Sequence, residues 1–266
     1  MPFAQTYFPN HDQNLMSGEG DVEKAREFFL QNRPNNLVNL LKNRYAWMSN
    51  YIEKNQKAIE LGCGAGFGPF FISNKKLVLT DVLPRSYTEL TVNALNMPFE
   101  NSSVDVLICS HMIHHLANPV TFFNEAARVL KPNGYLLIQE INTSFLMRLL
   151  LRAMRHEGWS YDVDVFDEKI TANDPRDPWS ANCAIPELLF RDNRVFETRI
   201  KHFKVEKNEL CECLAFPLSG GVIARTFSIP LPNIALKMVN FIDNVLVKCA
   251  PGLFALGRSV VLRKIG

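Results

Sequence analysis

Between residues 57 and 141, short apolar runs alternate with segments of helical character. Four of the runs are strong: KAIEL (57–61), KLVLTDV (76–82), VDVLICS (104–110) and YLLIQEI (135–141). Such runs are typical of strands buried on both faces of a parallel sheet. ELTVNA (89–94) predicts a weaker strand, residues 67–73 predict a short helix, and Asn118-Pro119 marks the start of a longer helix. The alternation predicts an α/β fold with helices on both faces of the sheet.

The flanking regions follow other patterns. Residues 1–20 are polar and aromatic without periodicity, which predicts a loosely ordered arm, and residues 36–52 place apolar side chains on one helical stripe. After residue 143 the alternation stops, and residues 157–190 are aromatic, acidic and rich in proline, which favours loops and short helices. Four more elements are expected: a helix at 144–156, a strand at 195–205, an amphipathic helix at 233–249 and a strand at 259–265.

These patterns indicate an N-terminal arm with helices (1–56) followed by one domain (57–266). Residues 143–194 and 206–256 are interpreted as insertions that form a lid. With 266 residues, the chain is long enough for one large domain with embellishments.

Composition excludes several classes of protein. The net charge of +2 argues against a nucleic-acid binder, which usually carries a strong basic excess. The N-terminus lacks the basic start and apolar core of a signal peptide, and no apolar run reaches the roughly 18 residues that a membrane span needs. The six cysteines form no CxxC pair, so a reducing, cytoplasmic compartment is expected. Cys211 and Cys213 lack further ligands at metal-site spacing, and no metal is expected.

The stretch AIELGCGAGFG (58–68) carries the candidate chemistry. Glycines at a strand-to-helix junction allow positive φ and let a ligand reach main-chain N–H groups at the carboxyl edge of the sheet. A dinucleotide fingerprint would need a third glycine where Phe67 or Pro69 stands, and no lysine is present for a phosphate loop. Asp81 closes the next strand, where its carboxylate can accept two hydrogen bonds from ribose hydroxyls.

Four motifs, in order, resemble those of the class I S-adenosylmethionine-dependent methyltransferases, of the type 11 group. They are ELGCGAG, the strand-ending Asp81, ALNMPFENSSVDVLICSHMIHHL and EAARVLKPNGYLLIQE, and they cover about residues 57–142. The resemblance implies a Rossmann-like, doubly wound, seven-stranded mixed sheet with its last strand antiparallel. SVVLRKI (259–265) is the candidate for that strand.

The resemblance also implies roles for individual residues, with S-adenosylmethionine as cofactor and S-adenosylhomocysteine as product. Five residues around the glycine loop would hold the methionine and ribose end: Glu60, Gly62, Cys63, Gly64 and Gly66. Asp81 would bind the ribose hydroxyls, Asn96 and Met97 would flank the adenine, and Ser110 and His111 would line the methionine side. One departure stands out, because residues 82–88 are too short for a helical crossover, so the third strand is expected to be short or irregular.

Methyl transfer from a sulfonium needs a base only when the acceptor must lose a proton. His111, His114, His115 and Glu140 lie near the carboxyl edge, and His114 is the candidate base. His115 resembles a position common throughout the family, so a structural role is the alternative. For Glu140, packing or a place on the cofactor side is equally compatible with the sequence.

The acceptor is expected to be a small molecule or a glycan or glycolipid, methylated on a hydroxyl, because aromatic and acidic residues gather at 157–190. A lid that packs its own aromatics explains the same composition. The alternatives are an aromatic metabolite as acceptor, or a cofactor-binding protein without turnover. Nucleic-acid bases are not expected, because SHMI stands where base amine methyltransferases carry an Asn/Asp-Pro-Pro-aromatic run. Residues 214–249 also allow peripheral contact with a membrane.

Overall fold

The structure of the chain is a computed structural model, and it describes residues 4–9, 21–73, 76–155, 157–223 and 225–266. The strands are β1 (Thr6–Tyr7), β2 (Ala58–Leu61), β3 (Leu77–Asp81), β4 (Leu90–Thr91), β5 (Val104–Ser110), β6 (Leu130–Ile141), β7 (Trp159–Ser160), β8 (Phe203–Cys211) and β9 (Gly257–Lys264). The helices are α1 (Val22–Asn32), α2 (Asn35–Tyr45), α3 (Pro119–Val129), α4 (Phe145–Met154), α5 (Ile185–Phe190), α6 (Asn193–Arg199), α7 (Ala215–Ser219), α8 (Asn233–Cys249) and α9 (Pro251–Phe254). Short 3₁₀ segments are η2 (Ala46–Tyr51), η3 (Gly68–Phe70) and η4 (Ile113–His115).

Seven strands form one sheet in the order β4-β3-β2-β5-β6-β9-β8. Neighbours from β4 to β6 are parallel, whereas β9 runs antiparallel to both β6 and β8. The doubly wound mixed sheet with an antiparallel last strand is therefore confirmed. From β2 the chain goes to β3 and β4 on one side, then returns to β5 on the other side. This reversal opens a crevice beyond the carboxyl ends of β2 and β5, where folds of this type bind ligands.

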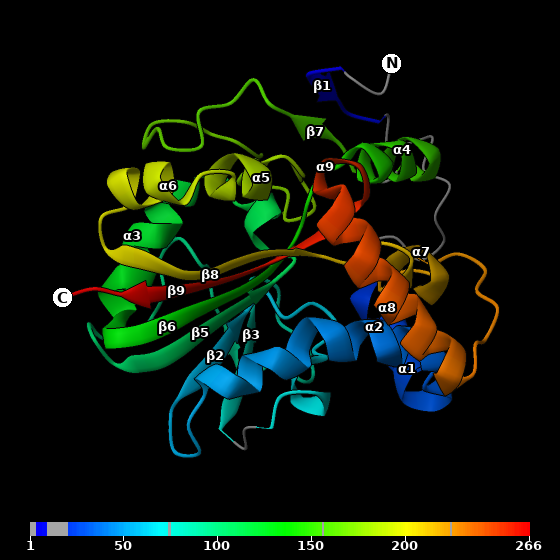
Figure 1. Cartoon of the computed structure of the whole chain (residues 1–266). Coiled ribbons are helices and arrows are strands. Elements are labelled where there is room, and N and C mark those ends of the chain that lie inside the picture. The colour runs from blue at the N-terminus through cyan, green and yellow to red at the C-terminus, as the bar shows by residue number, and fades with distance from the viewer. Residues whose placement is uncertain (1–3, 10–20, 74–75, 156, 224) are drawn as a thin grey trace.

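Helices cover both faces of the sheet (Figure 1). Successive residues of β5 alternate between the two cores: Leu107 and Cys109 pack with α3, α5 and α6, while Val106 and Ile108 pack with α1 and α2. Because strand side chains alternate between faces, an almost fully apolar strand is what a sheet covered on both faces requires. The N-terminal helices are therefore part of the second core layer.

Several local expectations need correction. Residues 195–205 were expected to form a strand, but α6 occupies the first part of this range and β8 begins only at Phe203. Asp192 caps α6 by accepting hydrogen bonds from the N–H groups of Arg194 and Val195. Phe196 and Ile200 are both buried, and their spacing fits one face of a helix as well as a strand.

Other elements are shorter than expected, or new. The helix expected at 67–73 is a single 3₁₀ turn. The strand within 89–94 is only the exposed pair Leu90–Thr91, which confirms that the third strand is short. The crossover at 82–88, all of it described, contains no helix, as its length predicted. Of the predicted arm at 1–20, residues 1–3 and 10–20 lie outside the described residues, while Thr6–Tyr7 pairs with β7.

The second inserted segment begins later than expected, because β8 runs to Cys211, inside the range 206–256. The helices expected at 144–156 and 233–249 are present as α4 and α8. Among the described residues, no helix combines the length and the apolar character that a bilayer crossing requires.

Candidate active site

A cavity of about 660 Å³ lies beyond the carboxyl ends of β2, β3 and β5. One end is formed by the glycine loop after β2, by Asp81 and by the segment 92–95. The other end is formed by His114 and His115, by α4 and by residues 174–179. The two ends belong to one continuous cavity, so ligands bound at the two ends would adjoin.

The glycine loop has the backbone that its composition predicts. Gly62, Gly64 and Gly66 have φ values of +59°, +51° and +63°, a region that other residues enter only at a cost. The loop carbonyls are held from outside the loop: Tyr87 Oη donates to the oxygen of Gly64 (2.7 Å), and Arg26 Nη1 donates to the oxygens of Ala65 and Gly66 (2.8 Å each). These bonds fix the loop from α1 and the β3–β4 crossover.

Asp81 stands beside this loop at the end of β3. Its Oδ2 accepts from the N–H of Gly64 (2.9 Å) and its Oδ1 accepts from the N–H of Leu83 (3.1 Å). Each carboxylate oxygen has two acceptor sites, so one remains on each oxygen. The carboxylate is thus oriented by the backbone at the cavity wall and can still accept two hydrogen bonds.

Glu60 and Gly68 form a buried pair behind the loop. Glu60 is fully buried, and its Oε1 accepts a hydrogen bond from Tyr45 Oη (3.0 Å). Burial raises the pKa of Glu60 to about 8. A Cβ on Gly68 would lie 2.2 Å from Glu60 Oε2, so only glycine leaves room for this carboxyl group. Glu60 supports the loop from below and does not line the cavity.

The predicted residues differ in how close they come to the cavity. Gly62, Cys63, Gly64, Asp81, Ser110, His111 and His114 line it, whereas Glu60, Gly66, Asn96 and Met97 do not. Asn96 ends a turn in which its N–H donates to the oxygen of Asn93, and it is exposed, while Met97 lies in the core. The neighbouring residues Val92, Asn93, Ala94 and Leu95 reach the wall instead.

His111 has an unusual backbone and side chain. It adopts φ +53° directly after β5, and its N–H donates to the oxygen of Gln139 (2.7 Å). Its buried Nε2 has no hydrogen-bond partner among the described residues. Burial, followed by the charge of Arg44, holds the pKa of His111 well below its usual value, so the ring is neutral. A polar ligand at this wall would satisfy Nε2.

His114 and His115 stand at the other end of the cavity, in η4. His114 is almost fully buried, and its Nδ1 lies 2.7 Å from Glu140 Oε2. Burial alone would lower the pKa of His114, but the carboxylates of Glu140 and Glu157 raise it to about 10. His115 behaves in the opposite way, because burial and then the charge of His114 lower its pKa to about 4. At neutral pH, His114 is therefore charged and His115 is neutral.

Comparison with known proteins identifies the type of domain that residues 59–138 belong to. Residues 59–138 match the model of a methyltransferase domain. A probable S-adenosylmethionine-dependent methyltransferase from Mycolicibacterium smegmatis is 31% identical over 99 residues, which are 32% of this chain and 37% of the relative. A phthiotriol/phenolphthiotriol dimycocerosates methyltransferase from Mycobacterium ulcerans is 28% identical over 128 residues, 38% of this chain and 44% of the relative. This chain carries a class I S-adenosylmethionine-dependent methyltransferase domain.

The fold agrees with this family over a longer stretch than the sequence does. The crystal structure of an S-adenosylmethionine-dependent methyltransferase from Archaeoglobus fulgidus aligns with a TM-score of 0.50 at 17% identity, and covers 85% of this chain and 93% of the other. In sequence, the chain spans between a third and two fifths of the length of the first curated relatives that it matches.

The residues of this methyltransferase domain fit S-adenosylmethionine, the cofactor of the family. The backbone of Gly64 borders open space, since a Cβ there would meet only Val22, at 4.0 Å. Asp81 offers free acceptor sites, and His111, whose Nε2 is buried without a partner, lines the same cavity. These observations match a ligand that has both hydroxyl groups and an amino-acid end.

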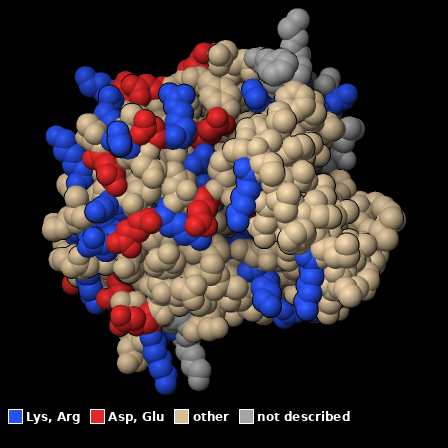
Figure 2. Space-filling model, in the orientation of Figure 1, with Lys and Arg blue, Asp and Glu red and all other residues tan. Residues whose placement is uncertain are grey.

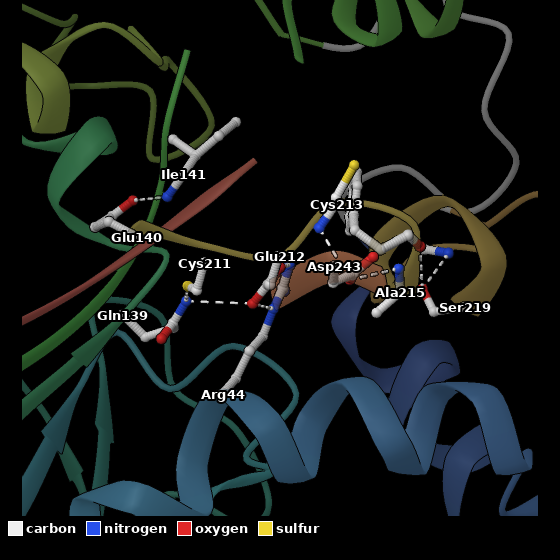
Figure 3. Close-up of polar contacts among 12 residues, drawn as sticks. Arg44, Gln139, Glu140, Ile141, Cys211, Glu212, Cys213, Ala215, Ser219 and Asp243 are labelled. Carbon is white, nitrogen blue, oxygen red and sulfur yellow. Dashed lines mark hydrogen bonds and ion pairs between the residues drawn. The ribbon is translucent and has the colours of Figure 1, made fainter. Parts of the chain in front are cut away.

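Two parts of this methyltransferase site escaped the sequence analysis. Arg26 holds the loop from α1, and Glu157 stands beside the histidines; both approach through tertiary packing and carry no local signal. A third feature lies under the cavity, where Arg44 of α2 makes a paired contact with Glu212 (Nε–Oε1 2.9 Å, Nη2–Oε2 2.7 Å). Figure 3 shows Arg44 reaching from α2 toward Glu212, beside Gln139 and Cys211.

Figure 3 also shows Asp243 of α8 at the start of α7. Its carboxylate accepts hydrogen bonds from the N–H groups of Cys213, Leu214 and Ala215. A carboxylate at a helix N-terminus is favourable, and here it ties α8 to the segment that follows β8. Phe216 and Pro217 of α7 line the cavity, so this contact positions part of its wall.

Proposed function

We propose that this chain transfers the methyl group of S-adenosylmethionine to a hydroxyl group of an acceptor with a substantial apolar part. The observation that carries the proposal is the single cavity, with the glycine loop and Asp81 at one end and the histidines at the other. A methyltransferase must hold two ligands in line, and such a cavity provides adjoining places for both.

At the cofactor end, we assign the ribose to Asp81, because its two remaining acceptor sites match two neighbouring hydroxyls. Gly62 and Gly64 bring bare backbone to the wall, and Ser110 and His111 lie where the amino-acid end would reach. We assign the adenine to Asn93 and Leu95 and not to Asn96 and Met97, for which the family resemblance implied this role, because only the former pair lines the cavity.

The bound cofactor supplies an electrophilic methyl group, and the protein has to orient the acceptor and deal with its proton. His114 lies at the acceptor end, and its position is fixed by Glu140. Because His114 is charged at neutral pH, it favours a negatively charged oxygen in its vicinity, and it acts as a base only after it has lost a proton. The base role of His114 remains a prediction.

The acceptor wall combines apolar and acidic groups. Met147, Leu150, Leu151 and Met154 of α4 line it, together with Ile141. Glu157, Asp174 and Asp177 line the same end. An acceptor whose hydroxylated head lies beside these acids and whose apolar part lies along α4 would match both kinds of lining residue. Lipid-linked and glycolipid acceptors have this composition. The name of the Mycobacterium ulcerans relative, a phthiotriol/phenolphthiotriol dimycocerosates methyltransferase, supports a hydroxylated acceptor.

An aromatic metabolite is the second candidate, and the apolar wall of α4 together with Trp179 favours it. A purely apolar wall would favour an aromatic metabolite more strongly. The acidic residues Glu157, Asp174 and Asp177 argue against such an acceptor. A protein that binds the cofactor without turnover is the third reading; the acceptor end of the cavity argues against it, because a cofactor sensor has no need for a second ligand site.

The exposed face of α8 supports peripheral contact with a membrane that holds such an acceptor. Ile234, Met238, Phe241 and Val245 are exposed along one side of this helix, and Phe227 and Ile229 are exposed just before it. Lys237 and Lys248 are exposed on the same helix, while its one acid, Asp243, is buried. In Figure 2, acidic side chains gather over the left part of the molecule, and the right part, where α8 lies, shows apolar or neutral atoms with a few basic ones. Apolar and basic groups together favour an anionic lipid surface.

The decisive experiment offers methyl-labelled S-adenosylmethionine and the purified chain to a cell extract, which is then separated into lipid, glycan, protein and small-molecule fractions. We expect label in the lipid or glycan fraction, and none with the Asp81→Ala variant. Label only in an aromatic small molecule would replace the favoured acceptor by the second candidate. If the chain binds S-adenosylhomocysteine but labels nothing in any fraction, the proposed turnover is wrong.

A further inference from the structure

Three potential metal ligands meet at the acceptor end of the cavity: His114, His115 and Glu157. One ligand atom from each residue lies within 4.8 Å of the other two. Nε2 of His114 is 3.8 Å from Glu157 Oε2, and Nε2 of His115 is 3.9 Å from Glu157 Oε1. Atoms that share one ion at about 2.1 Å lie roughly 3–3.5 Å apart. Side-chain shifts of under about 1 Å would therefore bring the three ligand atoms to the distances that binding one ion requires.

The second ring nitrogen of each histidine has a partner of its own. Nδ1 of His114 lies 2.7 Å from a carboxylate oxygen of Glu140, and Nδ1 of His115 lies 3.1 Å from the carbonyl oxygen of Ser180. A carbonyl only accepts, so His115 carries its hydrogen on Nδ1 and its Nε2 has a lone pair. Metal-binding histidines typically donate their other N–H to a carboxylate or a backbone carbonyl. Both histidines show this arrangement, and it is independent of the distances to Glu157. His114 is charged without metal, so it would release its Nε2 proton when an ion binds there.

Glu157 is placed by contacts between distant parts of the chain. It precedes β7, which pairs with β1, and a Cβ on the following Gly158 would lie 2.3 Å from the carbonyl oxygen of Tyr7. Cys183 Sγ donates to Glu157 Oε2 at 3.2 Å. The N-terminal strand and the segment before α5 thus hold this carboxylate over η4.

We propose that His114, His115 and Glu157 bind one divalent first-row transition metal ion, such as Zn²⁺, at the acceptor end of the cavity. Two imidazoles and one carboxylate suit such ions, whereas Mg²⁺ and Ca²⁺ prefer oxygen ligands alone. Three protein ligands leave at least one coordination position, which is the pattern of catalytic zinc sites. All three residues line the cavity, so that position is open to an acceptor.

The role of the ion rests on the proposed function, although its binding does not. An acceptor hydroxyl that occupies the open position would lose its proton more readily, because the ion stabilises the negative oxygen. The proton goes to water, an oxygen lone pair forms the new bond to the methyl carbon, and the electrons of the broken carbon–sulfur bond return to sulfur. No oxidant or reductant is needed. A metal would also remove the need for His114 as a base.

The test uses the whole chain, stripped with a chelator and dialysed. Titration with Zn²⁺ by calorimetry should show one ion per chain, and Co²⁺ should give the visible absorption of a site with nitrogen and oxygen ligands. Glu157→Gln and His115→Ala should each weaken Zn²⁺ binding by more than about 100-fold. His202→Ala is the matched control, because His202 is exposed and remote from the cavity lining, and it should bind like the intact chain.

A positioning variant separates a metal site from an ordinary buried ion pair. Glu140→Gln should keep the one-to-one stoichiometry and weaken Zn²⁺ about 10- to 100-fold. Thermal unfolding of each variant without metal verifies that it is folded, and Glu157 is the safer of the ligand positions because its side chain is 18% exposed. The proposal is overturned if the stripped chain binds no Zn²⁺, or if Glu157→Gln and His115→Ala bind it as tightly as His202→Ala does.

S-adenosylhomocysteine binding, measured on the same stripped samples, keeps the two proposals apart. Cofactor binding without metal binding would refute only the metal site. Metal binding without cofactor binding would refute only the proposed methyl transfer.

Discussion

The two ends of the cavity differ in whether backbone or side-chain atoms form them. At the cofactor end, the hydrogen bonds use backbone atoms of the glycine loop. Asp81 accepts from the N–H of Gly64, Tyr87 donates to the carbonyl oxygen of Gly64, and Arg26 donates to the carbonyl oxygens of Ala65 and Gly66. At the acceptor end, the wall consists of side chains from η4, from α4 and from residues 157–179. The first end lies at the strand ends of the sheet, and the second combines η4, which follows β5, with residues between β6 and α5.

This difference separates two tasks. A site made of backbone depends on glycines and on φ values, so its shape tolerates few substitutions. A site made of side chains on an inserted segment can change its specificity without disturbing the sheet, because loops accept variation that strands do not. The acceptor should therefore be decided by η4, by residues 143–202 and by α7, and the cofactor by residues 58–95 with Ser110 and His111.

Arg44 lines the cavity and forms a buried ion pair with Glu212, and breaking this pair should have the largest effect. Arg44→Met leaves the carboxylate of Glu212 buried without its cation, so we expect a loss of about 3–5 kcal/mol in the free energy of unfolding, measured with urea. In the double variant, Arg44→Met with Glu212→Leu, most of this loss should return, because no charge stays buried. A loss well under about 1 kcal/mol in the single variant would show that Glu212 is not left as an uncompensated buried charge.

Glu60 makes the stability of the cofactor end depend on pH. Its pKa is raised to about 8 in the folded chain by burial, against the ordinary value of 4.5. Between these values the unfolded chain releases this proton and the folded chain keeps it, so stability falls as the pH rises from about 5 to about 8. Relative to Glu60→Gln, the intact chain should lose on the order of 3 kcal/mol across this window.

Urea titrations at pH 5, 6.5 and 8 measure this difference. Glu100→Gln serves as a control, since Glu100 is exposed and should run parallel to the intact chain. Equal slopes for the intact chain and Glu60→Gln would mean that Glu60 is ionised when buried.

His114 tests the acceptor end in isolation. His114→Ala should lower turnover about 100-fold, whether His114 acts on a proton or holds an ion. The affinity for S-adenosylhomocysteine should stay within about two-fold, because the cofactor end does not depend on this side chain. His202→Ala should change neither quantity. An equal loss of cofactor affinity in His114→Ala would show that the two ends are not separate.

The exposed face of α8 should give the smallest change in stability and a clear change in membrane contact. Met238→Ser with Phe241→Ser alters exposed positions, so the free energy of unfolding should move by less than about 0.5 kcal/mol per substitution. Sedimentation with anionic phospholipid vesicles should fall several-fold. Val195→Ser, on the exposed side of α6, is the matched control. If the intact chain, the double variant and the Val195→Ser control sediment equally with the vesicles, α8 does not contact the membrane.

The sheet could be predicted from sequence because its strands are strongly marked. Apolar runs such as VDVLICS are buried on both faces, and the glycines of 62–66 carry the positive φ that the loop needs. The prediction of a strand at 195–205 was wrong for a physical reason. Phe196, Ile200 and Phe203 are buried at spacings that fit either a helix or a strand, and the N-cap at Asp192 stabilises the helix.

The candidate site could be predicted only where its residues follow a strand. Asp81, Ser110 and His111 do, and they reach the cavity. Asn96 and Met97 follow a strand that is only two residues long, and the turn after it presents Asn93 and Leu95 instead. Glu157 depends on the pairing of β1 with β7, two strands too short to leave a pattern in the sequence.

The central claim is that the glycine loop and Asp81 form a cofactor site that works independently of the acceptor end. Calorimetry with S-adenosylhomocysteine on the intact chain and on Asp81→Ala tests it most directly. We predict micromolar binding by the intact chain and a loss of ten-fold or more in the variant, since hydrogen bonds to a carboxylate contribute about 1.5–3 kcal/mol. No binding by the intact chain, or equal binding by the two proteins, would contradict the account.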